Sequence, residues 1–434
     1  MWQKILAFFS KSKKKTEQET YSSLRHVYTP VQSLLVGMYV TELDIPWLDS
    51  PFMFRGFTIE TENDMKLLRD TCQYVYIDQT KQAKAKGVKL SPELEEKRLL
   101  TFGKPPERLG SFEKEVGRAE KTYKETGVIV SGFMDKIADG GGIDTKLAKE
   151  AVQACVNSVL HSPDAFLWLS QLKDKDEYTS QHSLNVCVLS IVLARHVGLE
   201  EEFLNNVGLC GMMHDMGKIL VPLEVLNKPG RLDDDELAIM QSHTTLGYEL
   251  LKSSDGMYYG AIETALTHHE HMDGRGYPKK LNANRLSYYS NIVAIADMYD
   301  AITSDRVYQK GRTHHEAIKI MLDVSGRHLE ERLVVKFIES LGTYPPGCYV
   351  ELSSGSVAVV LEVNGQFKLR PKILIILDEE KNLIDESVVD LSEMVLDISG
   401  QPLTIKAIID PTLYQINTEK YYKQGVIQKG FLNK

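Results

Sequence analysis

Five histidines and two aspartates could together hold metal ions in this chain. Asp297 follows the apolar run Ile292–Ala296, where a carboxylate is costly to bury unless it is paired or bound to a metal. His268 and His269 are adjacent, and neighbours on a helix diverge by about 100°, so both reach one site only if it spans two centres. The complete set is His182, His214, Asp215, His243, His268, His269 and Asp297.

These residue types indicate a pair of divalent cations. Imidazoles suit Fe, Mn, Zn or Ni, and a carboxylate can bridge two ions. Ions about 3.5–4 Å apart can share a water, lower its pKa and clamp the attacking and leaving oxygens of a phosphoryl transfer. The five cysteines are scattered, which excludes a thiolate-rich structural zinc site. One such histidine alone would more often be an ordinary core or surface residue, but the seven residues together favour two divalent metal ions.

Composition limits the classes of function. A length of 434 residues predicts two to three domains, and 43% hydrophobic with 26% charged residues excludes global disorder. The net charge of −9 argues against a protein that binds duplex nucleic acid. No apolar run is long enough to span a membrane, and the N-terminal apolar stretch is too short for a secretion signal. Scattered cysteines are typical of a reducing compartment, so we expect a cytoplasmic protein.

The pattern of the chain predicts a multidomain protein. A central all-α domain stands between a small α+β N-terminal domain and a small β-rich C-terminal appendage, because strand-like alternation returns only after Pro345. The expected segments are 1–28 for a disordered or amphipathic N-terminus, 29–85 for the α+β domain, 86–111 for a linker, 112–342 for the helical domain, 343–400 for the β-rich appendage and 401–434 for a tail.

Two helices of the central domain have clear local signals. Val128, Phe133 and Ile137 are expected on one buried face of the first, and Asp144 is expected to cap the start of the second. The N-terminus allows two interpretations. Its apolar residues and the following lysines suit weak contact with an anionic membrane, but a frayed terminus is the simpler alternative and the one we favour.

Two runs of this sequence resemble the HD-GYP family, a branch of the HD metal-dependent phosphohydrolases. The first is His214–Lys218, with the sequence HDMGK, and the second is His268–Pro278, with the sequence HHEHMDGRGYP. The resemblance covers about residues 150–340 and continues in the run Ile295–Ala301. The segment Gly37–Val40 also looks like part of a domain of unassigned function that often precedes this family.

The resemblance implies an HD-type helical fold and hydrolysis of cyclic di-GMP, a bacterial second messenger. The product would be the linear dinucleotide pGpG, and in some members GMP. All seven residues above would be metal ligands, with Asp215 bridging. Asp215 and Lys218 would form the catalytic group, Lys218 binding the scissile phosphate. Arg306 and Asp176 would also contact the substrate.

The segment Gly276-Tyr277-Pro278 has two compatible interpretations. In the family this loop is proposed to contact partner diguanylate cyclases, whereas the glycines also permit a tight structural loop. Glu270 and His271, which precede this segment, are expected to be solvated neighbours of the ligands. The oligomeric state stays open, with a homodimer through the N-terminal unit as one arrangement.

Three positions depart from the family pattern. Tyr178 stands where some members have a Glu that adds a third metal, so we expect two metals and hydrolysis that stops at pGpG. Gln309 replaces a Lys near the substrate, with Lys310 beside it. Gly326-Arg327-His328 replaces a Gly-Thr pattern, which we expect to be harmless.

Two alternatives to a cyclic di-GMP hydrolase stay open. The chain could be a catalytically slow signalling adaptor that binds cyclic di-GMP or a cyclase. It could also be an enzyme that prefers another cyclic dinucleotide. A complete ligand set favours the enzyme, because an adaptor has no need to keep every ligand.

Overall fold

The computed structural model describes residues 26–45, 57–59, 62–78, 105–171, 178–304, 310–365, 367–393, 395–397, 399–410 and 414. The chain divides into two compact units, residues 1–101 with 283–288, and residues 102–282 with 289–434. Residues 1–25, most of the segment 1–28 for which a disordered or amphipathic N-terminus was predicted, lie outside the described part. Residues 26–28 are described and belong to a strand, so the prediction was wrong for these three. Within the described residues, no helix combines the length and apolar character needed to cross a membrane.

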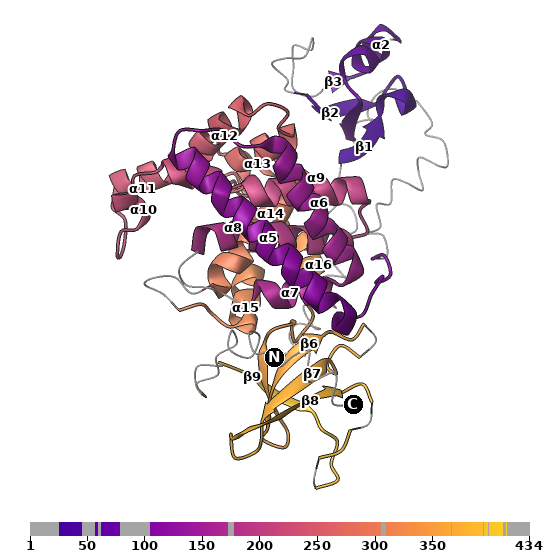
Figure 1. The fold of residues 1–434 in the computed structure, drawn as a ribbon. Coiled ribbons are helices and arrows are strands. Elements are labelled where there is room, and N and C mark those ends of the chain that lie inside the picture. Colours follow the sequence, from indigo (N-terminus) through magenta and orange to yellow (C-terminus); the bar gives the residue numbers. More distant parts are fainter. Residues whose placement is uncertain are drawn as a thin grey trace. The chain divides into compact units, whose positions relative to one another are not determined.

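The N-terminal unit is a small antiparallel sheet with one helix, as predicted. Its strands are β1 (His26–Pro30), β2 (Tyr39–Leu43), β3 (Phe57–Thr58) and β4 (Tyr74–Asp78), in the order β1-β4-β2-β3, and α2 spans Glu62–Thr71. The core of the unit includes Val40, Leu68 and Ile77, all fully buried. Figure 1 shows the unit in indigo.

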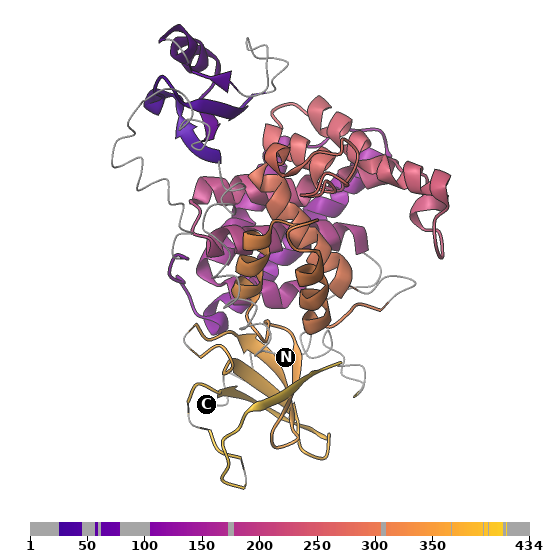
Figure 2. The same cartoon turned by 180° about the vertical axis from the view of Figure 1, so that it is seen from behind.

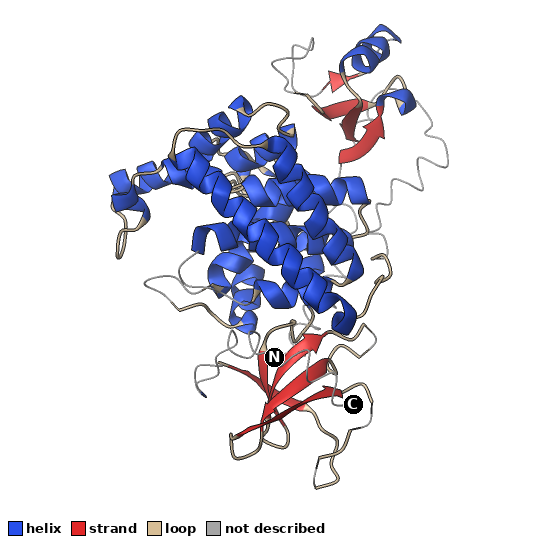
Figure 3. Ribbon diagram, viewed as in Figure 1, coloured by secondary structure: helices blue, strands red, loops and turns tan. Residues whose placement is uncertain are grey.

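In the middle of the second unit, the described residues form helices joined by loops and no named strand, as Figure 3 shows in blue and tan. This confirms the predicted all-α domain. Its helices are α5 (Phe112–Ala138), α6 (Thr145–His161), α7 (Pro163–Ser170), α8 (Tyr178–His196), α9 (Glu201–Met213), η3 (Met216–Leu220), α10 (Leu223–Leu226), α11 (Asp234–Gln241), α12 (His243–Ser253), α13 (Tyr259–Thr267), α14 (Tyr288–Thr303), α15 (His314–Val324) and α16 (Glu331–Leu341).

Local signals in the first two of these helices were only partly reliable. The Asp144 carboxylate accepts a hydrogen bond from the Leu147 N–H at 3.0 Å, which confirms the predicted cap of α6. On α5, Phe133 and Ile137 are buried, but Val128 is 74% exposed and Val130 is buried in its place. The prediction for Val128 was wrong because the buried stripe follows positions 126, 130, 133 and 137.

The prediction contained no helix at α7. All eight residues of α7 are buried, so the helix has no polar face and its sequence shows no helical period. Ser162 caps its start by accepting a hydrogen bond from the Ala165 N–H at 3.3 Å, and Pro163 occupies the first position. Burial on every side explains why periodicity gave no signal.

The C-terminal part is an antiparallel sheet, which confirms the β-rich appendage (Figure 2). Its strands are β5 (Tyr349–Leu352), β6 (Val357–Glu362), β7 (Lys372–Leu377), β8 (Leu383–Asp390) and β9 (Ile405–Ile409), in the order β8-β7-β6-β5-β9. Strand β9 pairs with β5, so the sheet continues past residue 400, where we expected a tail to begin. As a partly exposed edge strand, β9 lacks the alternation that would have revealed it.

A buried carboxylate joins the helices to this sheet. Asp164 of α7 accepts a hydrogen bond from the Val363 N–H at 3.3 Å and pairs with Arg108 at 2.7 Å. Arg108 also pairs with Glu362 at the end of β6, again at 2.7 Å. Burial raises the pKa of Asp164 to about 6, although the neighbouring Arg108 opposes the shift.

Candidate metal centre

The seven predicted residues come from five helical segments and meet at one place in the core of the helical domain. His182 lies on α8, His214 and Asp215 join α9 to η3, and His243 begins α12. His268 and His269 follow α13, and Asp297 lies on α14. Their ligand atoms form three overlapping groups, each within 4.8 Å: Asp215 with His243, His268 and His269; His182 with His214 and Asp215; and His214 with His268 and Asp297.

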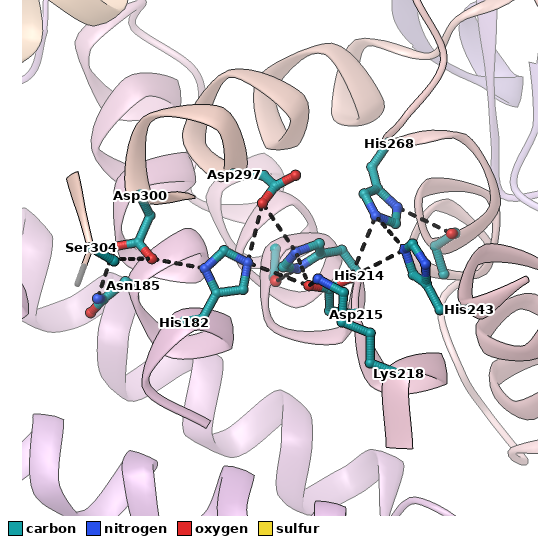
Figure 4. Close-up of polar contacts among 12 residues, drawn as sticks. His182, Asn185, His214, Asp215, Lys218, His243, His268, Asp297, Asp300 and Ser304 are labelled. Carbon is teal, nitrogen blue, oxygen red and sulfur yellow. Dashed lines mark hydrogen bonds and ion pairs between the residues drawn. The ribbon is translucent and has the colours of Figure 1, made fainter. Parts of the chain in front are cut away.

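Asp215 lies at the centre of this arrangement (Figure 4). Its Oδ2 is 3.3 Å from His182 Nε2 and 3.2 Å from His214 Nε2. Its Oδ1 lies on the other side, 3.4 Å from His243 Nε2 and 3.6 Å from His268 Nε2. Each oxygen therefore faces a different pair of imidazoles, as a carboxylate between two cations would.

Asp297 adds a second carboxylate to one half of the cluster. Its Oδ1 is 3.1 Å from His182 Nε2 and 3.9 Å from His214 Nε2. It is 9% exposed, whereas Asp215 is 1% exposed. Two carboxylates this deep in a helical core need positive charge beside them.

Three of the five histidines are held in the tautomer that binds metals. The Nδ1–H groups of His214 and His243 each donate to a backbone carbonyl at 2.7 Å, of Gly211 and Met240 respectively. His268 Nδ1 donates to the carbonyl of Thr264 at 3.0 Å. Because a carbonyl only accepts, each Nε2 keeps its lone pair and faces the cluster.

Two buried polar atoms of the cluster have no hydrogen-bond partner among the described residues: His214 Nε2 and Asp215 Oδ1. Such orphaned atoms are rare in a folded protein unless a water or an ion satisfies them. Both atoms are good donors to a cation. The donor set, its burial and these unsatisfied atoms therefore fit divalent metal ions.

Charges in the cluster also suit cations. Burial raises the pKa of Asp215, but His214 and Lys218 outweigh it and hold that pKa well below its ordinary value. Burial lowers the pKa of His243 to about 4. Burial and the adjacent His268 hold the pKa of His269 well below its ordinary value. Ionised carboxylates and neutral imidazoles are the forms that bind metals.

His182 shows the opposite shift. Burial lowers its pKa, but hydrogen bonds to Asp215, Asp297 and Asp300 outweigh burial and raise that pKa well above its ordinary value. The three surrounding carboxylates thus retain a proton on this imidazole when no other cation balances them. A bound cation would take over that role.

Sequence reasoning missed a group of residues behind His182. Asp300 Oδ2 accepts from His182 Nδ1 at 2.8 Å, and Asp300 Oδ1 accepts from Asn185 Nδ2 at 3.0 Å. The Tyr123 hydroxyl donates to Asn185 Oδ1 at 2.8 Å. The sequence did contain a signal for Asp300, because Asp297 and Asp300 are two carboxylates three residues apart in an otherwise apolar helix, and both are buried.

Two glycines let the turn after His214 meet α12. A Cβ on Gly217 would lie 2.0 Å from the His243 carbonyl oxygen and 2.4 Å from the Gly247 N. The backbones of η3 and α12 are therefore in direct contact, which fixes Asp215 against His243. Lys218, one turn beyond His214, pairs with Asp215 and keeps 25% of its side chain exposed.

The Gly-Tyr-Pro loop folds back onto the ligand segment. A Cβ on Gly276 would lie 2.4 Å from Glu270 Cα, so only glycine fits there. Tyr277 stacks on His269, with ring centroids 4.8 Å apart, and its N–H donates to the His269 carbonyl at 3.1 Å. The expectation of a solvated Glu270 was wrong. Its buried carboxylate accepts from the backbone N–H groups of Lys279 and Leu281, at 2.6 and 2.9 Å, and so holds the loop.

A cavity of about 450 Å³ lies beside the cluster. His268, His269 and Asp297 line one part of it, and Arg312 lines another. Of the predicted substrate contacts, Lys218 borders the cluster, while Asp176 and Arg306 lie outside the described residues, as does Gln309.

Three family models match the chain. Residues 169–333 match an HD domain, residues 27–148 a domain of unknown function (DUF3391), and residues 349–396 a KOW domain associated with HD domain.

Several characterised proteins and solved structures are similar to the chain. A cyclic di-GMP phosphodiesterase of Pseudomonas aeruginosa is 36% identical over 371 residues, which are 83% of this chain and 88% of that protein. A 3′3′-cGAMP-specific phosphodiesterase of Vibrio cholerae is 36% identical over 162 residues, 37% of this chain and 31% of that protein. The solved structure of a HDG"Y"P protein from Bdellovibrio bacteriovorus is 17% identical, covers 72% of this chain and 98% of that one, and has a TM-score of 0.43.

Proposed function

The chain belongs to the HD-GYP family of metal-dependent HD-domain phosphohydrolases, and we propose that it hydrolyses cyclic di-GMP to linear pGpG at a two-metal centre. The observation that carries this proposal is the position of Asp215, whose two oxygens face two different pairs of histidines. A relative that matches most of the chain carries the name of this activity.

We propose that the seven side chains are shared between two cations. One would be held by His182, His214 and Asp297, and the other by His243, His268 and His269, with Asp215 shared. When bound, such ions polarise phosphoryl oxygens and lower the pKa of a water. Imidazole with carboxylate suits Fe or Mn, which are the metals we propose.

Protein groups bind and orient the scissile phosphate. Lys218 lies beside Asp215 with part of its side chain exposed, so its ammonium can pair with a phosphate oxygen at the centre. The charge that develops on this phosphate is stabilised by the same ammonium. Arg306 and Asp176 remain proposed substrate contacts.

We propose that the number of bound metal ions decides whether hydrolysis yields pGpG or GMP. Tyr178 begins α8, four residues before His182, and stands where some family members have a third-metal carboxylate. With two ions, we propose that hydrolysis ends at pGpG. A Glu at this position would be the change that extends it to GMP.

Anaerobic purification with elemental analysis and a product assay tests the proposal. We expect two equivalents of Fe or Mn per chain and pGpG from cyclic di-GMP. The double variant His214→Ala, Asp215→Ala should lose turnover while its circular dichroism stays native. The matched control is His196→Ala, because this histidine pairs with Glu339 away from the cluster.

If the double variant were as active as the wild type, the proposed metal site would be wrong. Three metal equivalents per chain in the elemental analysis would contradict the proposal that Tyr178 leaves the centre with two ions. Tight binding of cyclic di-GMP without product over hours supports the adaptor alternative. Faster hydrolysis of a hybrid cyclic dinucleotide than of cyclic di-GMP identifies a different preferred substrate.

A further inference from the structure

We infer that Arg312 selects guanine, by donating hydrogen bonds to O6 and N7 of a substrate base that occupies the cavity beside the metal centre. The inference rests on the proposed function and concerns which cyclic dinucleotide the centre accepts.

The cavity is continuous with the metal centre. His268, His269 and Asp297 belong both to the cluster and to the cavity wall. A phosphate bound at the cluster therefore has one of its attached nucleosides beside the cavity. The volume of about 450 Å³ lies in the range of pockets that bind small ligands.

The lining of the cavity suits a base better than a second phosphate. Apolar side chains form much of the wall, and a base has apolar faces whereas a phosphate needs water or donors. His271 and His328 add an aromatic surface, with rings 4.0 Å apart and nearly parallel. The apolar wall consists of Ala294, Met298, Ala301, Ile302, Ile320 and Leu329.

Arg312 has a firmly held backbone and an exposed side chain. Its N–H donates to the Ile302 carbonyl at 2.8 Å, at the end of α14. A Cβ on the preceding Gly311 would lie 2.2 Å from the Thr303 carbonyl oxygen, so this contact requires glycine. The following residue, Thr313, caps α15 in a reciprocal capping box with Glu316. A fixed backbone reduces the entropy lost when the guanidinium binds.

The chemistry of the guanidinium distinguishes the two purines. Guanine presents two acceptors, O6 and N7, on one edge, and the planar fork of an arginine matches both. Adenine presents N7 beside an amino donor, which opposes another donor. The Arg312 charge acts on the Glu316 carboxylate, but the Glu316 Oε2 atom already accepts hydrogen bonds from Thr313. The exposed guanidinium can therefore turn its donors toward a ligand.

Three cyclic dinucleotides test the inference. Cyclic di-GMP and cyclic di-IMP both have O6 and N7, whereas cyclic di-AMP lacks O6. We would measure kcat/KM for each and, by equilibrium titration, the affinity of chelator-treated protein, which cannot turn over substrate. Arg312→Ala should weaken binding and kcat/KM for cyclic di-GMP and cyclic di-IMP by roughly tenfold to a hundredfold. Cyclic di-AMP should change by less than about threefold.

The control is Lys319→Ala, which removes an exposed positive charge from α15 without touching the cavity wall. It should leave all three ligands unchanged. Equal weakening of all three ligands by Arg312→Ala would assign the side chain to phosphate and overturn the inference, as would no change. A wild-type protein that neither binds nor hydrolyses cyclic di-GMP would instead overturn the proposed function.

Discussion

His182 donates a hydrogen bond from Nδ1 to Asp300 Oδ2 at 2.8 Å, which turns its Nε2 toward Asp215 and Asp297. Asn185 and Ser304 donate to the same Asp300 carboxylate, at 3.0 and 3.1 Å. Asp300 is thus held from several sides and in turn fixes the ring of His182. A carboxylate behind a ligand histidine sets its tautomer and raises its basicity.

Replacing Asp300 should weaken metal binding without removing any ligand. We expect Asp300→Ala to lower the affinity for Mn²⁺ by roughly tenfold to a hundredfold, because the His182 ring loses its anchor. Metal titration against a competing chelator measures this. Ser304→Ala, which removes one hydrogen bond to Asp300, is the control and should have a smaller effect. An affinity for Asp300→Ala within twofold of wild type would contradict the role.

The same substitution at two glycines should have opposite effects on stability. Gly217→Ala places a methyl group against the backbone of α12 and should lower the free energy of unfolding by about 1–3 kcal/mol. Gly132→Ala lies in the exposed interior of α5 with open space around it, and should raise that free energy by about 0.5–1 kcal/mol. Urea unfolding compares the two variants. If Gly217→Ala left the free energy of unfolding unchanged, η3 and α12 could move apart at little cost.

The stacking of Tyr277 on His269 predicts a graded response. Tyr277→Phe keeps the ring and should retain metal affinity. Tyr277→Ala removes it and should lower that affinity about twofold to tenfold, which corresponds to an aromatic contact of about 0.5–1.5 kcal/mol. The same variants tested for binding to a diguanylate cyclase domain address the second role proposed for the loop. If wild type, Tyr277→Phe and Tyr277→Ala bound metal with equal affinity, the stacking of Tyr277 on His269 would not contribute to metal binding.

Asp164 should make stability depend on pH between about 4 and 6. Burial raises its pKa in the folded protein to about 6, from an ordinary value of 3.8. The folded state therefore binds the proton more tightly, and stability falls as pH rises through this window, by roughly 3 kcal/mol in total. Urea unfolding of wild type and Asp164→Asn at pH 4.5 and 6.5 measures the difference, and the variant should lose this component.

Arg108→Gln provides a second test of the same group. Arg108 opposes the upward shift, so its loss should raise the pKa of Asp164 further and move the sensitive window to higher pH. If Asp164→Asn and wild type had the same pH dependence, Asp164 would not be the group responsible.

The metal centre was predictable because its residues interrupt apolar helices and match known motifs. His214 and Asp297 are polar residues inside runs that otherwise form core, which is a local signal. Asp300 was missed although it lies beside Asp297. Its partner His182 is 118 residues away in sequence, and no local pattern records such a pairing.

Two elements of the fold were missed for opposite physical reasons. Helix α7 is buried on every side, so its hydrophobicity has no period. Strand β9 is exposed on much of its surface and depends on hydrogen bonds to β5, which lies more than fifty residues earlier. Both elements form because of tertiary contacts, which the secondary-structure propensities of their residues do not reflect.

The position of Asp215 between two pairs of imidazoles has a consequence for how the two proposed ions would be acquired. With an ion only beside His182 and His214, Asp215 Oδ1 would remain buried without a hydrogen-bond partner among the described residues, which is costly. The other oxygen, Oδ2, already pairs with Lys218. We therefore expect the proposed ion beside His243 and His268 to bind first or together with the other, and a chelator to remove it last.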